Sequence, residues 1–61
     1  MSPGKFLCKL VKMNDFQKLR LIIRKNGSIV NQINDTGETP AFVALKLGLP
    51  ECFKILYTNE G

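Results

Sequence analysis

The sequence predicts an all-α fold in which two helix–turn–helix units stack side by side. One observation is an internal match at an offset of 34 residues, which pairs Asn14 with Gly48, Leu19 with Phe53, Leu21 with Ile55 and Gly27 with Gly61. Repetition at a fixed period of about 20–50 residues is typical of stacked-repeat proteins. A second observation is the spacing of apolar and capping residues, which indicates four short helices.

The first half of the chain carries two of these helices. Residues 5–13 have apolar side chains at the spacing of one helix face, namely Phe6, Leu7, Leu10, Val11 and Met13. A second helix is predicted from Asp15 to about Arg24, because Asn14 or Asp15 can cap its first turn with a side-chain oxygen. Its apolar stripe consists of Leu19, Ile22 and Ile23, with Phe16 beside it. We expect this helix to end at Asn26-Gly27, with Gly27 in the left-handed conformation.

The second half begins with a predicted connector over residues 28–39, extended at Ile29-Val30 and turning at residues 34–37, which are rich in turn-forming side chains. Thr39 is a good helix cap, and Pro40 suits the first position of a third helix because it needs no hydrogen bond there. This helix should stop at Leu47, with Gly48 as its C-terminal glycine. Pro50 then begins a fourth helix, whose apolar side chains are Phe53, Ile55, Leu56 and Tyr57.

The length of the chain allows a single domain. At 61 residues it lies near the lower limit for independent folding, so we treat residues 1–61 as one unit, with a first repeat at about 5–31 and a second at about 32–61. Apolar residues make up 44% and charged residues 23%, which is ordinary for a folded chain. No apolar run approaches the roughly 20 residues that span a bilayer, and lysines interrupt the N-terminal apolar residues, unlike in a signal peptide. We therefore expect a cytoplasmic or nuclear protein.

A turn-and-helix motif in the second half points to a known family. Gly37-Glu38-Thr39-Pro40 is followed by Ala44, then by Gly48 and Glu51, and the motif is preceded by Val30-Asn31. With this spacing, Asn31 to Leu56 resembles an ankyrin repeat, and Phe6 to Asn31 is similar to an N-terminal ankyrin repeat, in which the Thr-Pro pair is commonly missing. The resemblance implies ankyrin-type repeats stacked as a short solenoid, with a hairpin-like turn between them.

Some positions depart from the family pattern. The family usually has Leu after Thr-Pro and Ala one turn later, whereas this chain has Ala41 and Leu45. Because residues four apart share a helix face, our hypothesis is that these two changes exchange volume and keep the core filled. Phe42 stands where the family usually has His.

The resemblance also implies a function, because ankyrin-like domains are protein-binding scaffolds. Family contacts usually come from the hairpin tips and from the exposed side of each first helix. Carried onto this sequence, the partner-binding candidates are Ile33, Asp35, Thr36 and Glu38 at the turn, Lys12 and Met13 in the first repeat, and Lys46 and Leu47 in the second. Each polar candidate has the alternative interpretation of a solvated surface residue, and Leu47 that of a core residue.

Catalysis and metal binding are not expected. The chain has no His, which is the commonest general base. Its two cysteines, Cys8 and Cys52, lie far apart in sequence, whereas a zinc site needs about four ligands. We interpret them as small buried apolar residues, and we expect no enzyme activity, no cofactor and no metal.

The charge distribution leaves a second class of function open. Residues 1–31 carry a net charge of +6 and residues 32–61 carry −2, which together give +4. A basic half is compatible with binding to nucleic acid or to an acidic surface. Against this alternative, the chain lacks the interleaved aromatic and basic residues that stack on bases. A steep fall of affinity with salt would favour a phosphate ligand over a protein partner.

A third class is a structural role as the cap of a longer repeat array. Stacked-repeat domains usually need about three repeats, so we expect an N-terminal piece of a longer ankyrin protein. The last helix would present Phe53, Leu56 and Tyr57 on or near an uncovered flank. The alternative is a complete small protein that self-associates through this flank.

Overall fold

The computed structural model describes residues 3–58, and every regular element in this range is helical. The elements are α1 (Pro3–Lys12), α2 (Phe16–Lys25), the 3₁₀-helix η1 (Gly27–Asn31), α3 (Pro40–Leu47) and α4 (Pro50–Thr58). The prediction of four helices in an all-α fold is therefore confirmed. The end of the second repeat at Gly61 lies outside the described residues.

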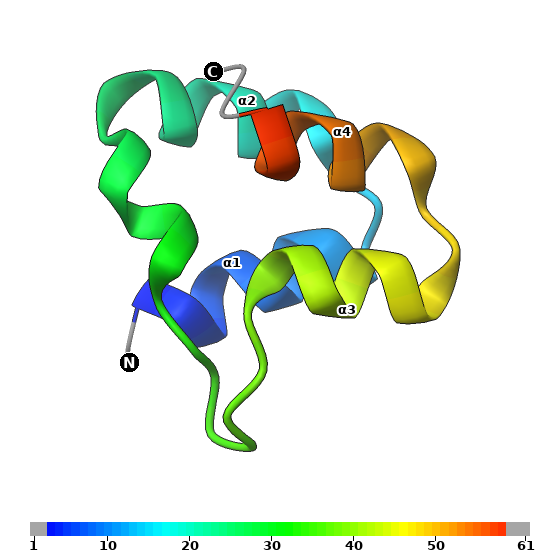
Figure 1. The fold of residues 1–61 in the computed structure, drawn as a ribbon. Coiled ribbons are helices and arrows are strands. Elements are labelled where there is room, and N and C mark those ends of the chain that lie inside the picture. Colours follow the sequence, from blue (N-terminus) through cyan, green and yellow to red (C-terminus); the bar gives the residue numbers. More distant parts are fainter. Residues whose placement is uncertain (1–2, 59–61) are drawn as a thin grey trace.

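The four α-helices form two layers (Figure 1). Helices α1 and α3 pack side by side in one layer, and α2 and α4 form the other. The turn between η1 and α3 projects beyond the α1–α3 layer. No helix within residues 3–58 is long and apolar enough to cross a membrane.

The core lies between the two layers and draws on all four α-helices. Its buried apolar residues are Leu7, Cys8, Leu10, Val11, Leu19, Ile23, Val43, Ala44, Cys52, Ile55 and Leu56. No polar or charged residue of the described range is buried with them. The burial of Cys8 and Cys52 as free thiols confirms their interpretation as small apolar residues.

The backbone at the ends of α1 and α3 matches at the same 34-residue offset as the sequence. Asn14 and Gly48 both adopt left-handed conformations, with φ of 56° and 69°. Each bond at the end of α1 has a counterpart at the end of α3: Asn14 N–H to Val11 O (2.8 Å) matches Gly48 N–H to Leu45 O (3.2 Å), and Asp15 N–H to Leu10 O (3.0 Å) matches Leu49 N–H to Ala44 O (2.9 Å). These bonds satisfy the last carbonyls of each helix and turn the chain back into the second layer.

The capping residues behave as the sequence indicates. The Asp15 carboxylate accepts a hydrogen bond from Lys18 N–H at 3.3 Å, and the Thr39 hydroxyl accepts one from Phe42 N–H at 3.2 Å. Pro40 stands at the start of α3. Each cap satisfies a donor that the first helical turn leaves without a partner, which explains why α2 and α3 begin where they do.

Two local predictions in the connector are wrong. Ile29 and Val30 are not extended but belong to η1, closed by bonds from Ile29 N–H to Asn26 O and from Gln32 N–H to Ile29 O. This tight coil brings both apolar side chains against the core. Gly27 is not left-handed, because Asn26 ends α2 with a φ of −152° and Gly27 then begins η1.

The predicted buried faces also need correction. Phe6, on the predicted apolar face of α1, is 37% exposed, whereas the 62% exposure of Met13 agrees with its prediction as a surface candidate. Leu45 is 63% exposed, so it does not exchange core volume with Ala41. The reason is that α3 directs Pro40, Val43 and Ala44 inward, and Leu45 lies outside that face. Leu56, expected near the open flank, is 4% exposed and belongs to the core.

Candidate functional site

The turn over residues 34–38 is held by one asparagine. The Asn34 side-chain oxygen accepts hydrogen bonds from the Thr36 N–H (3.0 Å), the Thr36 hydroxyl (2.9 Å) and the Glu38 N–H (2.9 Å). Asn34 N–H donates to Glu38 O at 2.9 Å, and Gly37 closes the turn with a φ of 82°. A short amide side chain that bonds the following backbone favours such a turn over other conformations. The exposed tip is therefore held in one shape.

Glu38 connects this turn to the end of α3. Its carboxylate accepts hydrogen bonds from the Lys46 ammonium and the Asn34 amide (3.3 Å), and it lies 3.0 Å from the Thr36 hydroxyl, whose single proton it shares with the Asn34 oxygen. These donors, of which the Lys46 ammonium has the largest effect, lower the pKa of Glu38 to about 2. The carboxylate is thus ionised at any physiological pH, and its charge is engaged within the protein.

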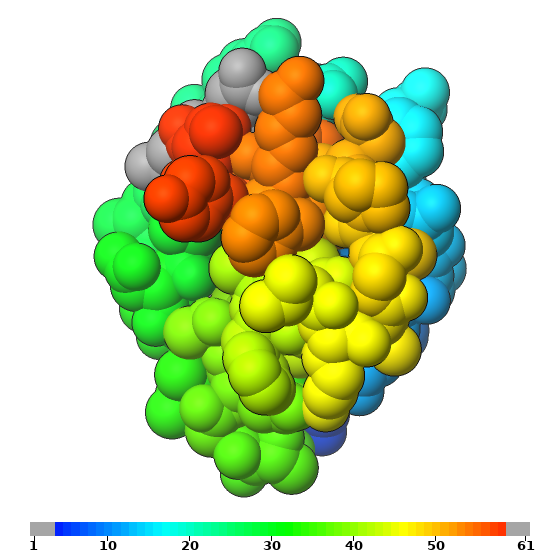
Figure 2. Space-filling model, turned by 45° about the vertical axis from the view of Figure 1, so that its right-hand side comes forward, coloured from blue at the N-terminus to red at the C-terminus, as the bar shows by residue number. Residues whose placement is uncertain are grey.

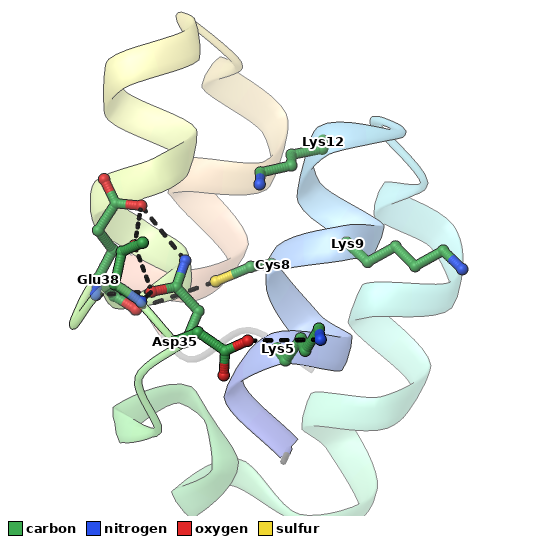
Figure 3. A pocket seen from close by; sticks show the side chains of 8 residues that line it. Lys5, Cys8, Lys9, Lys12, Asp35 and Glu38 are labelled. Atoms are coloured by element: carbon green, nitrogen blue, oxygen red, sulfur yellow. Dashed lines mark hydrogen bonds and ion pairs between the residues drawn. The ribbon is translucent and has the colours of Figure 1, made fainter. Parts of the chain in front are cut away.

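A groove separates the turn from α1 (Figure 3). It encloses about 470 Å³ and is lined by Lys5, Cys8, Lys9, Lys12, Asn34, Asp35, Thr36 and Glu38. Lys5 forms an ion pair with Asp35 at 3.4 Å across the groove. The Cys8 thiol lies 4.0 Å from the Glu38 carbonyl oxygen, between α1 and the turn.

The groove does not have the chemistry of a nucleophilic site. Burial raises the pKa of the Cys8 thiol, although the Lys12 charge acts in the opposite direction, so the thiol stays protonated at neutral pH. Burial, followed by the Asp15 and Glu51 charges, likewise raises the pKa of Cys52. Within residues 3–58, no group of three or more His, Cys, Asp or Glu side chains could hold a metal ion. The arrangement offers charges of both signs and a shaped surface, which suits binding.

The structure brings most of the predicted site residues together. Lys12, Asp35, Thr36 and Glu38 line the groove, and Lys46 is joined to it through Glu38. The other three candidates lie outside the groove lining and are exposed, namely Ile33 (53%), Met13 (62%) and Leu47 (48%). Because Leu47 is 48% exposed, its alternative interpretation as a core residue is wrong.

Sequence reasoning missed several residues of this surface. Lys5 and Lys9 share the lining with Lys12, and Asn34 is the residue that shapes the turn. The recurrence of lysines along α1 was the available signal for the first two, and the dense turn-forming residues were the signal for Asn34. Beside this surface, the Phe42 ring lies 5.7 Å from the Lys46 ammonium and is 48% exposed.

Comparison of the chain with protein-family models, with curated proteins and with solved structures gives no match.

Proposed function

We propose that this protein is a non-catalytic protein–protein interaction module of the ankyrin type, working in the cytoplasm or nucleus. Its partner binds at the groove between α1 and the 34–38 turn and on the neighbouring exposed residues of α3. The observation that carries this proposal is the Asn34-centred turn, whose exposed tip is held by three hydrogen bonds to one side-chain oxygen. A surface already held in its binding shape loses less conformational entropy when a partner binds.

The chemistry of the surface favours a polypeptide partner. Basic side chains on α1 face acidic ones on the turn, as the Lys5–Asp35 ion pair shows. Apolar side chains, including Ile33 and Leu47, are exposed around this charged region. A peptide segment with charges of both signs and an apolar residue complements such a mixture. A polyphosphate ligand would gain less here, because Asp35 and Glu38 already engage the charges of Lys5 and Lys46.

The experiment is a selection of binding peptides from a displayed random library on the 61-residue chain, followed by affinity measurement of the selected peptides. We expect Lys12→Glu to weaken binding at least about tenfold, by removing one groove charge and adding the opposite one. Lys25→Glu is the matched control, because it makes the same charge change on an exposed residue of α2, outside the groove lining. Peptides that bind both variants as tightly as the original chain would overturn the proposal.

A duplex oligonucleotide serves as the second probe in the same assay. If the chain binds it more tightly than any selected peptide, with affinity falling steeply between low and moderate salt, then nucleic acid is the ligand and the proposal is wrong. If only peptides bind, and their affinity falls with salt less steeply than phosphate-driven binding does, the proposal is supported.

A further inference from the structure

Positive charge is concentrated on the first two helices. Helix α1 carries three Lys, α2 carries four Lys and Arg, and neither helix contains Asp or Glu. The only acidic residue within residues 3–31 is Asp15, which accepts a hydrogen bond from Lys18 N–H at the start of α2. Lys5 pairs with Asp35 of the turn, but no ion pair within residues 3–58 engages the other cations of α1 and α2. Their charges therefore add up instead of cancelling.

Two stripes of exposed residues place some of these cations beside apolar side chains. Each stripe follows the spacing of one helix face, namely Phe6, Lys9 and Met13 along α1 and just past its end, and Lys18, Leu21 and Lys25 along α2. Helix α2 contacts α1 and runs back along it (Figure 1). The three apolar side chains are 37% (Phe6), 62% (Met13) and 56% (Leu21) exposed. We call the surface formed by these six residues the basic face.

The 34-residue match shows which way the basic face points. Three of its residues have counterparts that are buried in the core, namely Lys9 with Val43, Lys18 with Cys52 and Leu21 with Ile55. The Cys52 thiol lies 3.5 Å from the Asn14 side-chain oxygen, so this side of the second half faces the first. In the first half the same direction leads into solvent. The basic face thus lies opposite the exposed side of α3 and α4, which Figure 2 shows in yellow-green to orange.

The mixture of cations and apolar side chains distinguishes between acidic partners. In a protein–protein interface, Lys9 and Lys18 would be desolvated, and the cores of such interfaces are depleted of lysine. A nucleic acid would pair with the cations but would leave Phe6, Met13 and Leu21 against phosphates. The boundary region of an anionic bilayer suits both kinds of side chain, because acidic headgroups lie directly above the acyl chains. Lysine also keeps its ammonium group in the hydrated layer while its stem lies along apolar surface.

We infer that the basic face binds peripherally to the anionic surface of a phospholipid bilayer. Its cations meet the acidic headgroups, and Phe6, Met13 and Leu21 reach toward the acyl chains. Lys9 is the only residue of this face that also lines the groove at the 34–38 turn, and its side chain points away from Asp35 and Glu38 (Figure 3). The bilayer and the peptide partner thus use different surfaces, and either proposal can fail without the other.

The test is sedimentation of the 61-residue chain with phosphatidylcholine vesicles that contain about one-third phosphatidylserine, and with vesicles of phosphatidylcholine alone. We expect binding to the anionic vesicles only, with a partition coefficient that falls as salt is added. Lys18→Gln should lower this coefficient about fivefold, which corresponds to one cation near such a surface. Lys54→Gln is the matched control: it makes the same change on an exposed residue of α4 and should lower the coefficient less than about twofold.

A second pair of variants tests the apolar part of the face. Leu21→Gln should lower the partition coefficient at least about fivefold, because it removes a side chain that enters the acyl boundary. Leu45→Gln is its control, since Leu45 is 63% exposed on α3, outside the basic face. All four substituted residues are exposed, so the helical circular dichroism of each variant should match that of the original chain.

Three results would overturn the inference. The first is that anionic vesicles bind no more of the chain than neutral ones. The second is that each variant on the basic face has the same effect as its control. The third is that polyglutamate or a duplex oligonucleotide displaces the chain from the vesicles and binds it more tightly, with a loss for Lys18→Gln and none for Leu21→Gln. That result would make an acidic macromolecule, and not a bilayer, the occupant of this face.

Discussion

Val11 and Leu45 occupy equivalent positions in the two halves, 34 residues apart. Truncating each to Ala distinguishes the effect of burial on stability from the effect of side-chain size. Val11 is fully buried between the layers, whereas Leu45 is 63% exposed on α3. Removing two methyl groups from Val11 costs about 1.6 kcal/mol of transfer free energy, at about 0.8 kcal/mol per buried group. The cavity left behind raises the loss to about 2–3 kcal/mol.

Leu45→Ala removes one more carbon than Val11→Ala does, but it should lower the free energy of unfolding by less. Full burial of a leucine stabilises by about 1.5–3 kcal/mol, and this side chain is mostly in water, so its loss should stay below about 1 kcal/mol. Alanine also has the higher helix propensity, which reduces both costs by a few tenths of a kcal/mol. The smaller truncation is therefore the more damaging one.

Urea unfolding followed by far-ultraviolet circular dichroism, at two protein concentrations, measures both free energies of unfolding. A domain of this size rarely has more than about 3–5 kcal/mol of stability, so Val11→Ala should remain folded but close to its limit. A loss for Leu45→Ala equal to or above that for Val11→Ala, at both concentrations, would refute the packing described above. A loss that grows with concentration would instead show that Leu45 is covered by a second copy of the chain in solution.

Three further predictions concern single positions. Gly4→Ala should lower stability by about 1–3 kcal/mol in the same urea assay, because a Cβ there would lie 2.1 Å from the Ile33 carbonyl oxygen; an unchanged midpoint would contradict this close approach. Gly48→Ala should lower the free energy of unfolding by about 1–2 kcal/mol. The left-handed backbone is the whole cause, because a Cβ at Gly48 would meet no atom within 4 Å. Gly48→Asn should lower it less, because Asn tolerates this conformation better. Because the pKa of Glu38 is lowered from 4.5 to about 2 in the folded chain, its contribution to stability is present above pH 4.5 and is lost as the pH falls toward 2. Thermal melts across this range should show a smaller acid loss for Glu38→Gln, and parallel curves would refute the assignment.

Much of the local structure could be predicted from single residues. Asp15, Thr39 and Gly48 mark helix ends through hydrogen bonds and backbone conformations that involve only neighbouring residues. The 34-residue match likewise needs no tertiary information, and it anticipates the repeated bonds at the ends of α1 and α3. Such signals are readable because their physical cause lies within a few positions of the chain.

The groove could be predicted only in part. The turn residues and Lys12 were candidates from the sequence, but the Lys5–Asp35 ion pair joins residues 30 positions apart. Ile29 and Val30 were predicted to be extended, yet they coil because the core beside α1 and α2 is where they can be buried. Here tertiary packing overrides local preference.

The sequence by itself determined the four α-helices, their order, the starts of α2, α3 and α4 and the end of α3, because each depends on contacts between near neighbours. Only the tertiary structure decided which side of α3 is buried. Apolar residues surround that helix, from Phe42 and Val43 to Leu45 and Leu47, so periodicity cannot distinguish its inner from its outer side. The packing of α3 against α1 and α4 makes the choice, since it buries Val43 and leaves Leu45 63% exposed.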